Sequence, residues 1–212
     1  GDDETTLKAR RFIIATGARP TVPPIPGLDN TDYLTYETVW DLEELPRRLI
    51  VVGAGPIGCE LAQAFCRLGP SVTLLEGAPR IMLQDEPEAA ELLSQHLVRD
   101  GVDLRLNAMV QRVRQSSDGI HVIVGDEEIL GDALLMSVGR TPNVAGLELD
   151  KAGVAYTPKG IQVNNRLRTT QRRIYAAGDC AGGYQFTHYA GWQGFMAVRN
   201  AFMPKFATAK AA

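Results

Sequence analysis

The segment Val51–Gly58, which reads VVGAGPIG, limits the possible folds of this chain more than any other feature of its sequence. It carries the pattern GxGxxG and stands at the end of an apolar run that predicts a β-strand, Leu49–Val52. Each glycine has its own role in such a turn: Gly53 permits the tight bend, Gly55 lets the backbone approach a diphosphate, and Gly58 lets a helix pack on the strand. Because any glycine-rich turn can match the bare pattern, its place between a strand and a helix is what gives it weight.

The residues after the glycines predict the helix that such a motif requires. Apolar side chains recur at helical spacing from Ile57 to Leu68, and Gly69-Pro70 provides a stop. Pro56 and Ile57 lie at the start of this helix, where unpaired N–H groups and the positive end of the helix dipole hold phosphate. The segment therefore predicts a dinucleotide-binding turn.

An acidic residue stands where a dinucleotide-binding unit needs one. The next apolar strand, Ser71–Glu76, ends about 20 residues after the first glycine, the distance at which a carboxylate hydrogen-bonds the adenosine ribose. Glu76 alone would be a solvated carboxylate at a strand end, but the glycines favour the ribose role. A carboxylate also repels a 2′-phosphate, and Gly77 and Ala78 offer no cation, so NAD is favoured over NADP. Arg80 is the nearby side chain that could still bind such a phosphate.

Strands that end at glycines alternate with helices along the chain, which predicts an α/β protein with a Rossmann-like fold. We expect a parallel sheet with helices, including a second helix over 86–99 and a further apolar strand at Ala133–Val138. A small antiparallel β-meander is also expected, formed by three or four short alternating segments. These segments are Val102–Leu106, Val110–Arg114, Ile120–Val124 and Glu128–Leu130.

Two segments repeat one pattern, an apolar strand followed by glycine, arginine and proline. They are Ile13–Pro20 (IIATGARP), which overlaps a predicted buried strand over 11–17, and Leu135–Pro142 (LMSVGRTP). A third strand reaches a glycine within Ile174–Asp179 (IYAAGD). The repetition suggests two related nucleotide-binding units in one chain. The proline-rich passage Pro20–Gly27 can be neither helix nor central strand, and it predicts a stiff connector between domains.

Composition excludes several classes of protein. The 22 basic and 25 acidic residues give a net charge of −3 without a block of like charge, so neither nucleic acid nor an anionic membrane surface is an expected partner. No stretch is apolar enough to cross a bilayer, and no signal peptide opens the chain. The three cysteines (Cys59, Cys66 and Cys180) and the three histidines have no metal-ligand spacing, so no metal is expected. The cysteine usage suits a reducing, cytoplasmic compartment.

Four motifs, taken in order, resemble the flavoprotein pyridine nucleotide–disulfide oxidoreductases, the group of dihydrolipoamide dehydrogenase, glutathione reductase and mercuric reductase. They are IIATGARP (13–20), VVGAGPIGCELAQAF (51–65), SVGRTPN (137–143) and IYAAGDC (174–180), and they span nearly the whole chain. The segment QFTHYA (185–190) is most similar to the mercuric-reductase-like branch. The resemblance implies a Rossmann-like FAD/NAD(P)-binding fold, and FAD beside NAD(P)H as a cofactor of the whole protein.

The resemblance assigns three further residues to the nicotinamide dinucleotide. Glu60 matches a glutamate near the nicotinamide and flavin rings, although an exposed glutamate in the first turn of a helix is an equally good interpretation. Gly139, with Arg140 after it, matches the GRxPN turn that lies against the nicotinamide end. Val110 matches a position whose backbone meets the adenine; otherwise it is a core residue of the meander.

Five residues match positions that contact FAD in the family. Thr16 and Gly17 resemble a strand exit beneath FAD. Asp179 resembles the aspartate that binds the ribityl chain; without the resemblance it would be a turn or N-cap residue. Thr187 and Ala190 begin a helix whose N-terminus points at the flavin pyrimidine edge in the family, where its dipole would stabilise negative charge on reduced flavin.

Parts of the family pattern are missing from the sequence. These are the first GxGxxG, which grips the FAD diphosphate, the redox-active CxxxxC, and the dimerisation domain with its catalytic histidine. The chain, which begins at Gly1, is therefore expected to be a piece of a longer homodimeric enzyme. The expected parts are 1–29, a late part of the FAD domain with the connector; 30–147, the NAD(P)-binding domain; 148–200, the remaining part of the FAD domain; and 201–212, a tail.

The expected function of the whole protein is hydride transfer from NAD(P)H to FAD and then to a disulfide or related acceptor. This chain alone is expected to bind NAD(H) weakly and to be inactive. Two alternatives are a related FAD-dependent NADH dehydrogenase or ferredoxin-reductase-type enzyme without a redox disulfide, and a non-catalytic NAD-sensing module. The FAD-like motifs argue against the sensing module.

Overall fold

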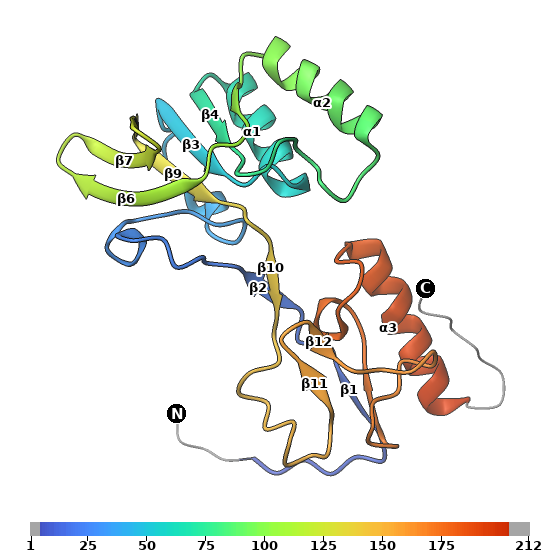
Figure 1. The fold of residues 1–212 in the computed structure, drawn as a ribbon. Helices are drawn as coiled ribbons and strands as arrows, with labels where there is room; N and C mark the ends of the chain where they lie inside the picture. Colours follow the sequence, from blue (N-terminus) through green and yellow to red (C-terminus); the bar gives the residue numbers. More distant parts are fainter. Residues whose placement is uncertain (1–4, 204–212) are drawn as a thin grey trace. The chain divides into compact units, whose positions relative to one another are not determined.

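A computed structural model describes residues 5–203, which form two compact units (Figure 1). One unit is the continuous segment Pro20–Gly139. The other combines the residues up to Arg19 with those from Arg140 onward. The chain therefore passes from the two-part unit into unit 20–139 and then returns to the two-part unit.

A four-stranded parallel sheet is the centre of unit 20–139, with strand order β5-β4-β3-β9. Helix α1 (Pro56–Leu68) connects β3 to β4, and helix α2 (Pro87–Arg99) connects β4 to β5; both lie on one face of the sheet (Figure 1). The predicted α/β class and parallel sheet are confirmed. The strands are β3 (Arg48–Val52), β4 (Ser71–Leu75), β5 (Asp103–Arg105) and β9 (Ala133–Met136).

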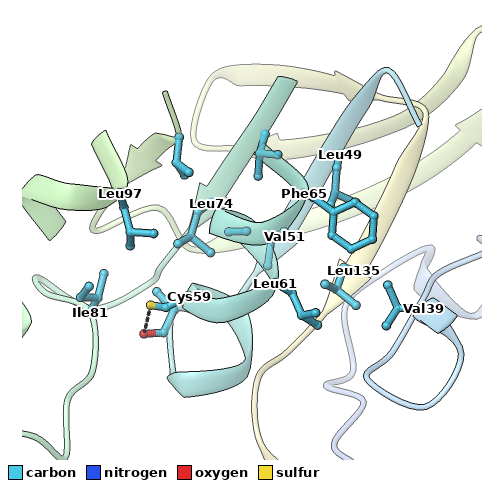
Figure 2. Close-up of a cluster of buried hydrophobic side chains, with 14 of the residues drawn as sticks. Val39, Leu49, Val51, Cys59, Leu61, Phe65, Leu74, Ile81, Leu97 and Leu135 are labelled. Atoms are coloured by element: carbon cyan, nitrogen blue, oxygen red, sulfur yellow. Dashed lines mark hydrogen bonds between the residues drawn. The ribbon is translucent and has the colours of Figure 1, made fainter. Parts of the chain in front are cut away.

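Both faces of this sheet are covered, which explains why its strands are apolar throughout. Leu49 and Val51 of β3 join the buried cluster on the helix side, where they meet α1 and α2 (Figure 2). Ile50 and Val52 belong to the opposite cluster, which the meander covers, because successive side chains of a strand point to opposite faces. A single strand thus anchors two cores. Figure 2 labels Val39, Leu49, Val51, Cys59, Leu61, Phe65, Leu74, Ile81, Leu97 and Leu135 of the first cluster.

Three antiparallel strands form the meander: β6 (Val110–Ser116), β7 (Gly119–Val124) and β8 (Glu127–Gly131). The fourth segment considered for it, Val102–Leu106, contains β5, which pairs in parallel with β4. That part of the prediction was wrong because a short alternating segment has the same pattern in either sheet. The helix before β5 makes it the last strand of a βαβ unit, and such a crossover returns the chain to the parallel sheet.

The proline-rich passage 20–27 packs within unit 20–139. The Val113 N–H donates to the Pro26 carbonyl (2.9 Å), and a Cβ at Gly27 would lie 1.9 Å from the Val113 carbonyl oxygen, so only glycine fits there. Leu28, which follows, is fully buried in the meander-side core. The compact unit therefore runs from Pro20 to Gly139, where the sequence predicted a domain over 30–147.

Short paired strands and one long helix make up the other unit. Helix α3 (Thr187–Phe202) packs on it through Met196, Ala197 and Ala201. The strand pairs are β1 (Phe12–Ile14) with β13 (Ile174–Ala176), β2 (Ala18–Pro20) with β10 (Arg140–Pro142), and β11 (Tyr156–Thr157) with β12 (Gly160–Ile161). The short 3₁₀ turns of the chain are Leu28–Asn30, Val39–Asp41 and Asp179–Ala181.

Two expectations for this unit need correction. The buried strand predicted over 11–17 is shorter, and Phe12 and Ile13 of β1 are exposed. The apolar run over 11–17 suggested a strand buried inside a sheet. Among residues 5–203, however, β1 pairs with β13 alone, so it is an edge strand. The tail predicted at 201–212 begins within α3, where Ala201 is buried; residues 204–212 lie outside the described part of the chain.

The repeated strand–glycine pattern has one backbone explanation. Strands β1, β9 and β13 each lead to a glycine with positive φ: Gly17 (68°), Gly139 (117°) and Gly178 (76°). Glycine adopts this region without the steric cost that a Cβ brings. The two strands that follow the first two glycines, β2 and β10, pair with one another.

Cys59 and Cys66 lie on α1, as free thiols. Cys59 is buried and donates to the Ala54 carbonyl (3.4 Å), which Figure 2 marks with a dashed line. Burial, with smaller contributions from the charges of Glu76 and Glu60, raises the pKa of the Cys59 thiol to about 12. The thiol therefore stays protonated and behaves as a core side chain.

A polar network on the meander gives an acid-dependent contribution to stability. His121 is buried on β7 between the carboxylates of Asp118 (3.0 Å) and Glu128 (3.2 Å). The hydrogen bond from Ser116, followed by that from His121, lowers the pKa of Asp118 from 3.8 to about 2. The Arg114 hydrogen bond, followed by the charge of Arg114, lowers the pKa of Glu128.

Replacing Asp118 by asparagine is expected to flatten the acid limb of stability. A carboxyl whose pKa is lower in the folded state stabilises the fold above its unfolded pKa, and this contribution is lost as pH falls through the folded value. The wild-type melting temperature should therefore fall between about pH 4 and about pH 2, and more steeply than that of Asp118→Asn. Thermal unfolding across this range measures the slope. Asp126→Asn, in the exposed turn between β7 and β8, is the matched control; equal slopes for all three proteins would contradict the prediction.

Candidate functional site

The glycines of the GxGxxG turn between β3 and α1 are required for different reasons. Gly53 has a φ of 99°, and a Cβ there would lie 2.6 Å from the Ser137 carbonyl oxygen. A Cβ at Gly58 would lie 1.8 Å from the Gly53 carbonyl oxygen and 2.7 Å from Ser137 Oγ. Gly53 and Gly58 are therefore fixed by the packing of the protein itself.

Gly55 is different, because the protein leaves space around it. Its φ of −75° is accessible to any residue, and a Cβ there would meet no atom within 4 Å. Gly55 is the N-cap of α1, and Pro56 and Ile57 form the first turn. The N-terminal N–H groups of a helix lack intrahelical acceptors, so this open space faces hydrogen-bond donors and the positive end of the helix dipole. The surroundings fit a phosphate group.

Ser137 holds the turn from the neighbouring strand end, and sequence reasoning gave it no role. Its Oγ donates to the carbonyls of Val52 (2.9 Å) and Gly53 (2.8 Å), and its N–H also donates to Val52 (2.8 Å). The available signal was its place in SVGRTPN, two residues before the glycine at 139. The serine ties the end of β9 to the GxGxxG turn.

Glu76 follows β4 and also binds the turn. Its Oε2 accepts a hydrogen bond from the Ala54 N–H (2.8 Å), and its Oε1 accepts one from the Ala78 N–H (2.9 Å). Glu76 is therefore more than a solvated carboxylate at a strand end, because it accepts hydrogen bonds from two backbone N–H groups. Each carboxylate oxygen can accept a further hydrogen bond, so the group is compatible with a ribose hydroxyl.

The Arg80 guanidinium is engaged by the loop that follows it. It donates to four backbone carbonyls, those of Ile81 (3.4 Å), Met82 (2.8 Å), Leu83 (2.8 Å) and Asp85 (3.2 Å). A guanidinium has five N–H donors in a fixed fork, and most of this fork is directed at the loop. A bidentate contact with phosphate would require Arg80 to give up some of these contacts, because both Nη atoms already donate to carbonyls.

The other residues predicted for the nicotinamide dinucleotide lie elsewhere on unit 20–139. Val110 begins β6 with its side chain in the meander-side core, so only its backbone is available to a ligand. Gly139 has a φ of 117° and accepts a hydrogen bond from the Thr21 N–H (3.0 Å). Glu60 is exposed on α1 but stands beyond the first turn, so the alternative of a first-turn glutamate does not describe it.

Four of the five residues predicted for FAD line one cavity of the other unit. The cavity has a volume of about 320 Å³, and Gly17, Asp179, Thr187 and Ala190 are among its lining residues. The remaining lining residues are Ala15, Arg140, Ala177, Gly178 and Gly194. The strand ends β1 and β13 and the start of α3 thus meet around one space.

Arg140 and Asp179 form an ion pair at this cavity. Arg140 donates to Asp179 Oδ2 (2.8 Å), with the two side chains 26% and 13% exposed, and it also donates to the Gln185 carbonyl. The arginine therefore links the predicted ribityl-binding carboxylate to the segment that leads into α3. Sequence reasoning placed Arg140 in the GRxPN turn but gave it no partner.

Thr16, the fifth predicted residue, is held outside the lining by Asn143. Thr16 Oγ1 donates to the Asn143 carbonyl (2.8 Å), and Asn143 Nδ2 donates back to the Thr16 carbonyl (2.9 Å). The Asn143 N–H donates to the Gly17 carbonyl (2.9 Å). The asparagine of SVGRTPN thereby fixes the glycine exit of β1.

Residues 5–203 contain no cluster of histidine, cysteine, aspartate and glutamate side chains able to hold a metal ion. Over the same residues, none of the helices has the length and apolar character needed to cross a membrane.

Comparison with known proteins shows the family of this chain. The family model of the pyridine nucleotide-disulphide oxidoreductases matches residues 1–194. The chain belongs to this family.

Three relatives show how much of such a protein the chain represents. It is 42% identical over 200 residues to a mercuric reductase of Bacillus cereus, covering 92% of this chain and 32% of that protein. The HOCl-induced flavoprotein disulfide reductase RclA from Escherichia coli superposes with a TM-score of 0.87 at 34% identity, over 94% of this chain and 46% of that one. A water-forming NADH oxidase from Lactobacillus brevis, bound to NADH, superposes with a TM-score of 0.83 at 26% identity, over 95% and 48%. The chain thus spans a third to a half of the length of these relatives.

Proposed function

We propose that unit 20–139 binds NAD(H) at the turn between β3 and α1. The observation that carries this proposal is the contrast between the glycines: Gly53 and Gly58 are fixed by internal packing, whereas Gly55 borders open space at the start of a helix. In this proposal the first turn of α1 holds the diphosphate and Glu76 holds the adenosine ribose. Val110 contacts the adenine through its backbone, and Gly139 and Glu60 lie toward the nicotinamide.

We infer that NAD is preferred to NADP. Glu76 would repel a 2′-phosphate, and Arg80, the candidate cation of the sequence, is directed at the carbonyls of 81–85. The NADH bound to the similar Lactobacillus brevis oxidase supports the same choice.

The second unit is proposed to hold part of FAD in the whole protein. Asp179 would accept a ribityl hydroxyl, with Arg140 fixing its position, while Gly17 and the start of α3 at Thr187 and Ala190 would border the flavin. Thr16 would support this surface through Asn143. The cavity fits such a role because its lining combines glycines, which permit close approach, with one carboxylate.

The proposed function of the whole protein is hydride transfer from NADH to FAD and onward to a disulfide or related acceptor. The two cofactors supply the redox chemistry, and the protein contributes binding and orientation. The name mercuric reductase among its relatives supports this class of reaction. We place the whole enzyme in the cytoplasm as a homodimer, and this chain alone is proposed to lack turnover; disulfide reduction by this chain with NADH would overturn that part.

A second candidate is flavin-dependent NADH oxidation without a redox disulfide, which the similarity to the Lactobacillus brevis oxidase favours. The cysteines of this chain do not decide between the two, because Cys59, Cys66 and Cys180 are free thiols on α1 and after β13. A disulfide-reduction assay with the whole protein separates them. Turnover with oxygen but not with a disulfide would support the second candidate.

Titration with NADH and NADPH, followed by nucleotide fluorescence, tests the cofactor site. The wild type is expected to bind NADH, with NADPH weaker by roughly tenfold or more, and Glu76→Ala should weaken NADH binding by roughly tenfold. Glu44→Ala, an exposed glutamate outside the proposed site, should bind NADH like the wild type. Tighter binding of NADPH than of NADH by the wild type would overturn the preference for NAD.

A further inference from the structure

Met109 lies directly on Gly77, the residue that follows the proposed ribose-binding carboxylate. A Cβ at Gly77 would lie 2.6 Å from the Met109 Cε and 3.3 Å from its sulfur. The thioether therefore occupies the position that any side chain at residue 77 would need. Met109 is nevertheless 66% exposed, so its opposite side remains free.

Backbone hydrogen bonds place this methionine beside Glu76. The Glu76 N–H donates to the Arg105 carbonyl (2.9 Å), and the Ala108 N–H donates to the Glu76 carbonyl (2.8 Å). The Asn107 N–H donates to the Ala78 carbonyl (2.9 Å), and a positive φ at Asn107 (53°) turns the chain between these contacts. The segment before β6 is thus fixed along the turn after β4.

We propose that Met109 is the apolar cover of the adenine end of this nucleotide site and a determinant of its specificity. The inference rests on the proposed function. Adenine is joined to the ribose that Glu76 would bind, so the ring must lie near the residues that flank this carboxylate. A thioether is polarisable and packs favourably on aromatic rings, and the exposed side of Met109 offers apolar surface at this position.

The contact also bears on what a larger residue at position 77 would meet. The φ of Gly77 is not in the positive region, so its backbone does not require glycine, but a side chain at 77 would have to move the flexible, exposed thioether of Met109 aside. An arginine at 77, which could pair with a 2′-phosphate, would have to displace the thioether. Met109 and Gly77 together therefore disfavour the arrangement that NADP needs.

The first test compares Met109→Ala and Met109→Leu by titration with NADH and by displacement of NADH with ADP-ribose. Met109→Ala should weaken the binding of NADH and of ADP-ribose by a similar factor, roughly two- to tenfold, because the proposed contact is with the adenine half that both contain. Met109→Leu, which keeps an apolar side chain of similar volume, should restore most of the affinity. Leu92→Ala, an exposed apolar residue of α2, is the matched control and should bind like the wild type.

The second test uses Gly77→Arg with and without Met109→Ala. The gain in NADPH affinity from the arginine should be larger by roughly threefold or more in the Met109→Ala background, since the arginine no longer has to displace the thioether. Equal gains in both backgrounds would overturn the role of Met109 in specificity.

The two levels of failure can be told apart. No saturable NADH binding by the wild type would overturn the proposed function and this inference with it. If the wild type binds NADH and Met109→Ala binds it with the same affinity, only the inference is overturned. The same holds if Met109→Ala loses affinity for NADH but not for ADP-ribose. Circular dichroism on each variant reports the fold independently of binding.

Discussion

Replacing Gly58 by alanine is expected to lower the free energy of unfolding of unit 20–139 by about 3 kcal/mol, the upper end of the usual cost of overpacking. The added methyl group would lie 1.8 Å from the Gly53 carbonyl oxygen. That oxygen cannot withdraw freely, because it accepts a hydrogen bond from Ser137 Oγ (2.8 Å). Thermal unfolding followed by circular dichroism should show the melting temperature lowered by roughly 10 °C, and NADH binding should be lost with the turn.

Gly55→Ala provides the matched control for this result. The same methyl group at residue 55 would meet no protein atom within 4 Å, so the free energy of unfolding should stay within about 0.5 kcal/mol of the wild-type value. NADH binding should nevertheless fall by more than about tenfold, because the methyl occupies the approach of the diphosphate. If both variants lost equal stability, the packing explanation for Gly58 would be wrong. If Gly55→Ala bound NADH normally, the proposed diphosphate site would be wrong.

Arg140→Ala is expected to destabilise the unit that contains α3 by about 2 kcal/mol, because it leaves the largely buried Asp179 carboxylate without its cation. It also removes the donor to the Gln185 carbonyl, which holds the segment before α3. Hydrogen–deuterium exchange should show faster exchange of the amides over 178–190. In the whole protein, the same change should lower the flavin content of the purified enzyme.

Two further variants separate an ion-pair effect from a general loss of packing. Arg172→Ala removes an exposed arginine of the same unit and should leave exchange over 178–190 unchanged. The double variant Arg140→Ala/Asp179→Ala should be more stable than Arg140→Ala alone, because no buried charge is then left unpaired. A double variant that is less stable than the single one would contradict this account.

Local patterns allowed much of unit 20–139 to be predicted. The run Leu49–Val52, the glycines after it and the stop at Gly69-Pro70 lie within a short stretch of sequence, and they predict β3, the turn and α1. The same is true of α2, whose expected and observed bounds nearly coincide. Helix period and glycine spacing are local quantities, so a single sequence contains them.

Features that depend on contacts between distant segments could not be predicted in this way. The sheet that β5 joins is decided by pairing with β4, which the alternating pattern of Val102–Leu106 does not specify. The contact of Met109 with Gly77 and the pairing of Arg140 with Asp179 follow from the folded chain path, and neither lies within one motif. The candidate residues at the glycine turn were therefore within reach of sequence reasoning, whereas the contacts of Met109 and Arg140 were not.

The continuity of unit 20–139 has a consequence for the order in which the protein folds. This unit is complete once residue 139 has been synthesised, and its folding brings the two ends together through the hydrogen bond from Thr21 to Gly139. Strands β1 and β13, which lie on either side of it in the sequence, must find each other across the whole insert. Closing a long loop has an entropic cost that grows with its length, and a folded insert with adjacent ends shortens the loop. Once unit 20–139 has folded, the effective loop between β1 and β13 is shorter, which favours the pairing of these two strands.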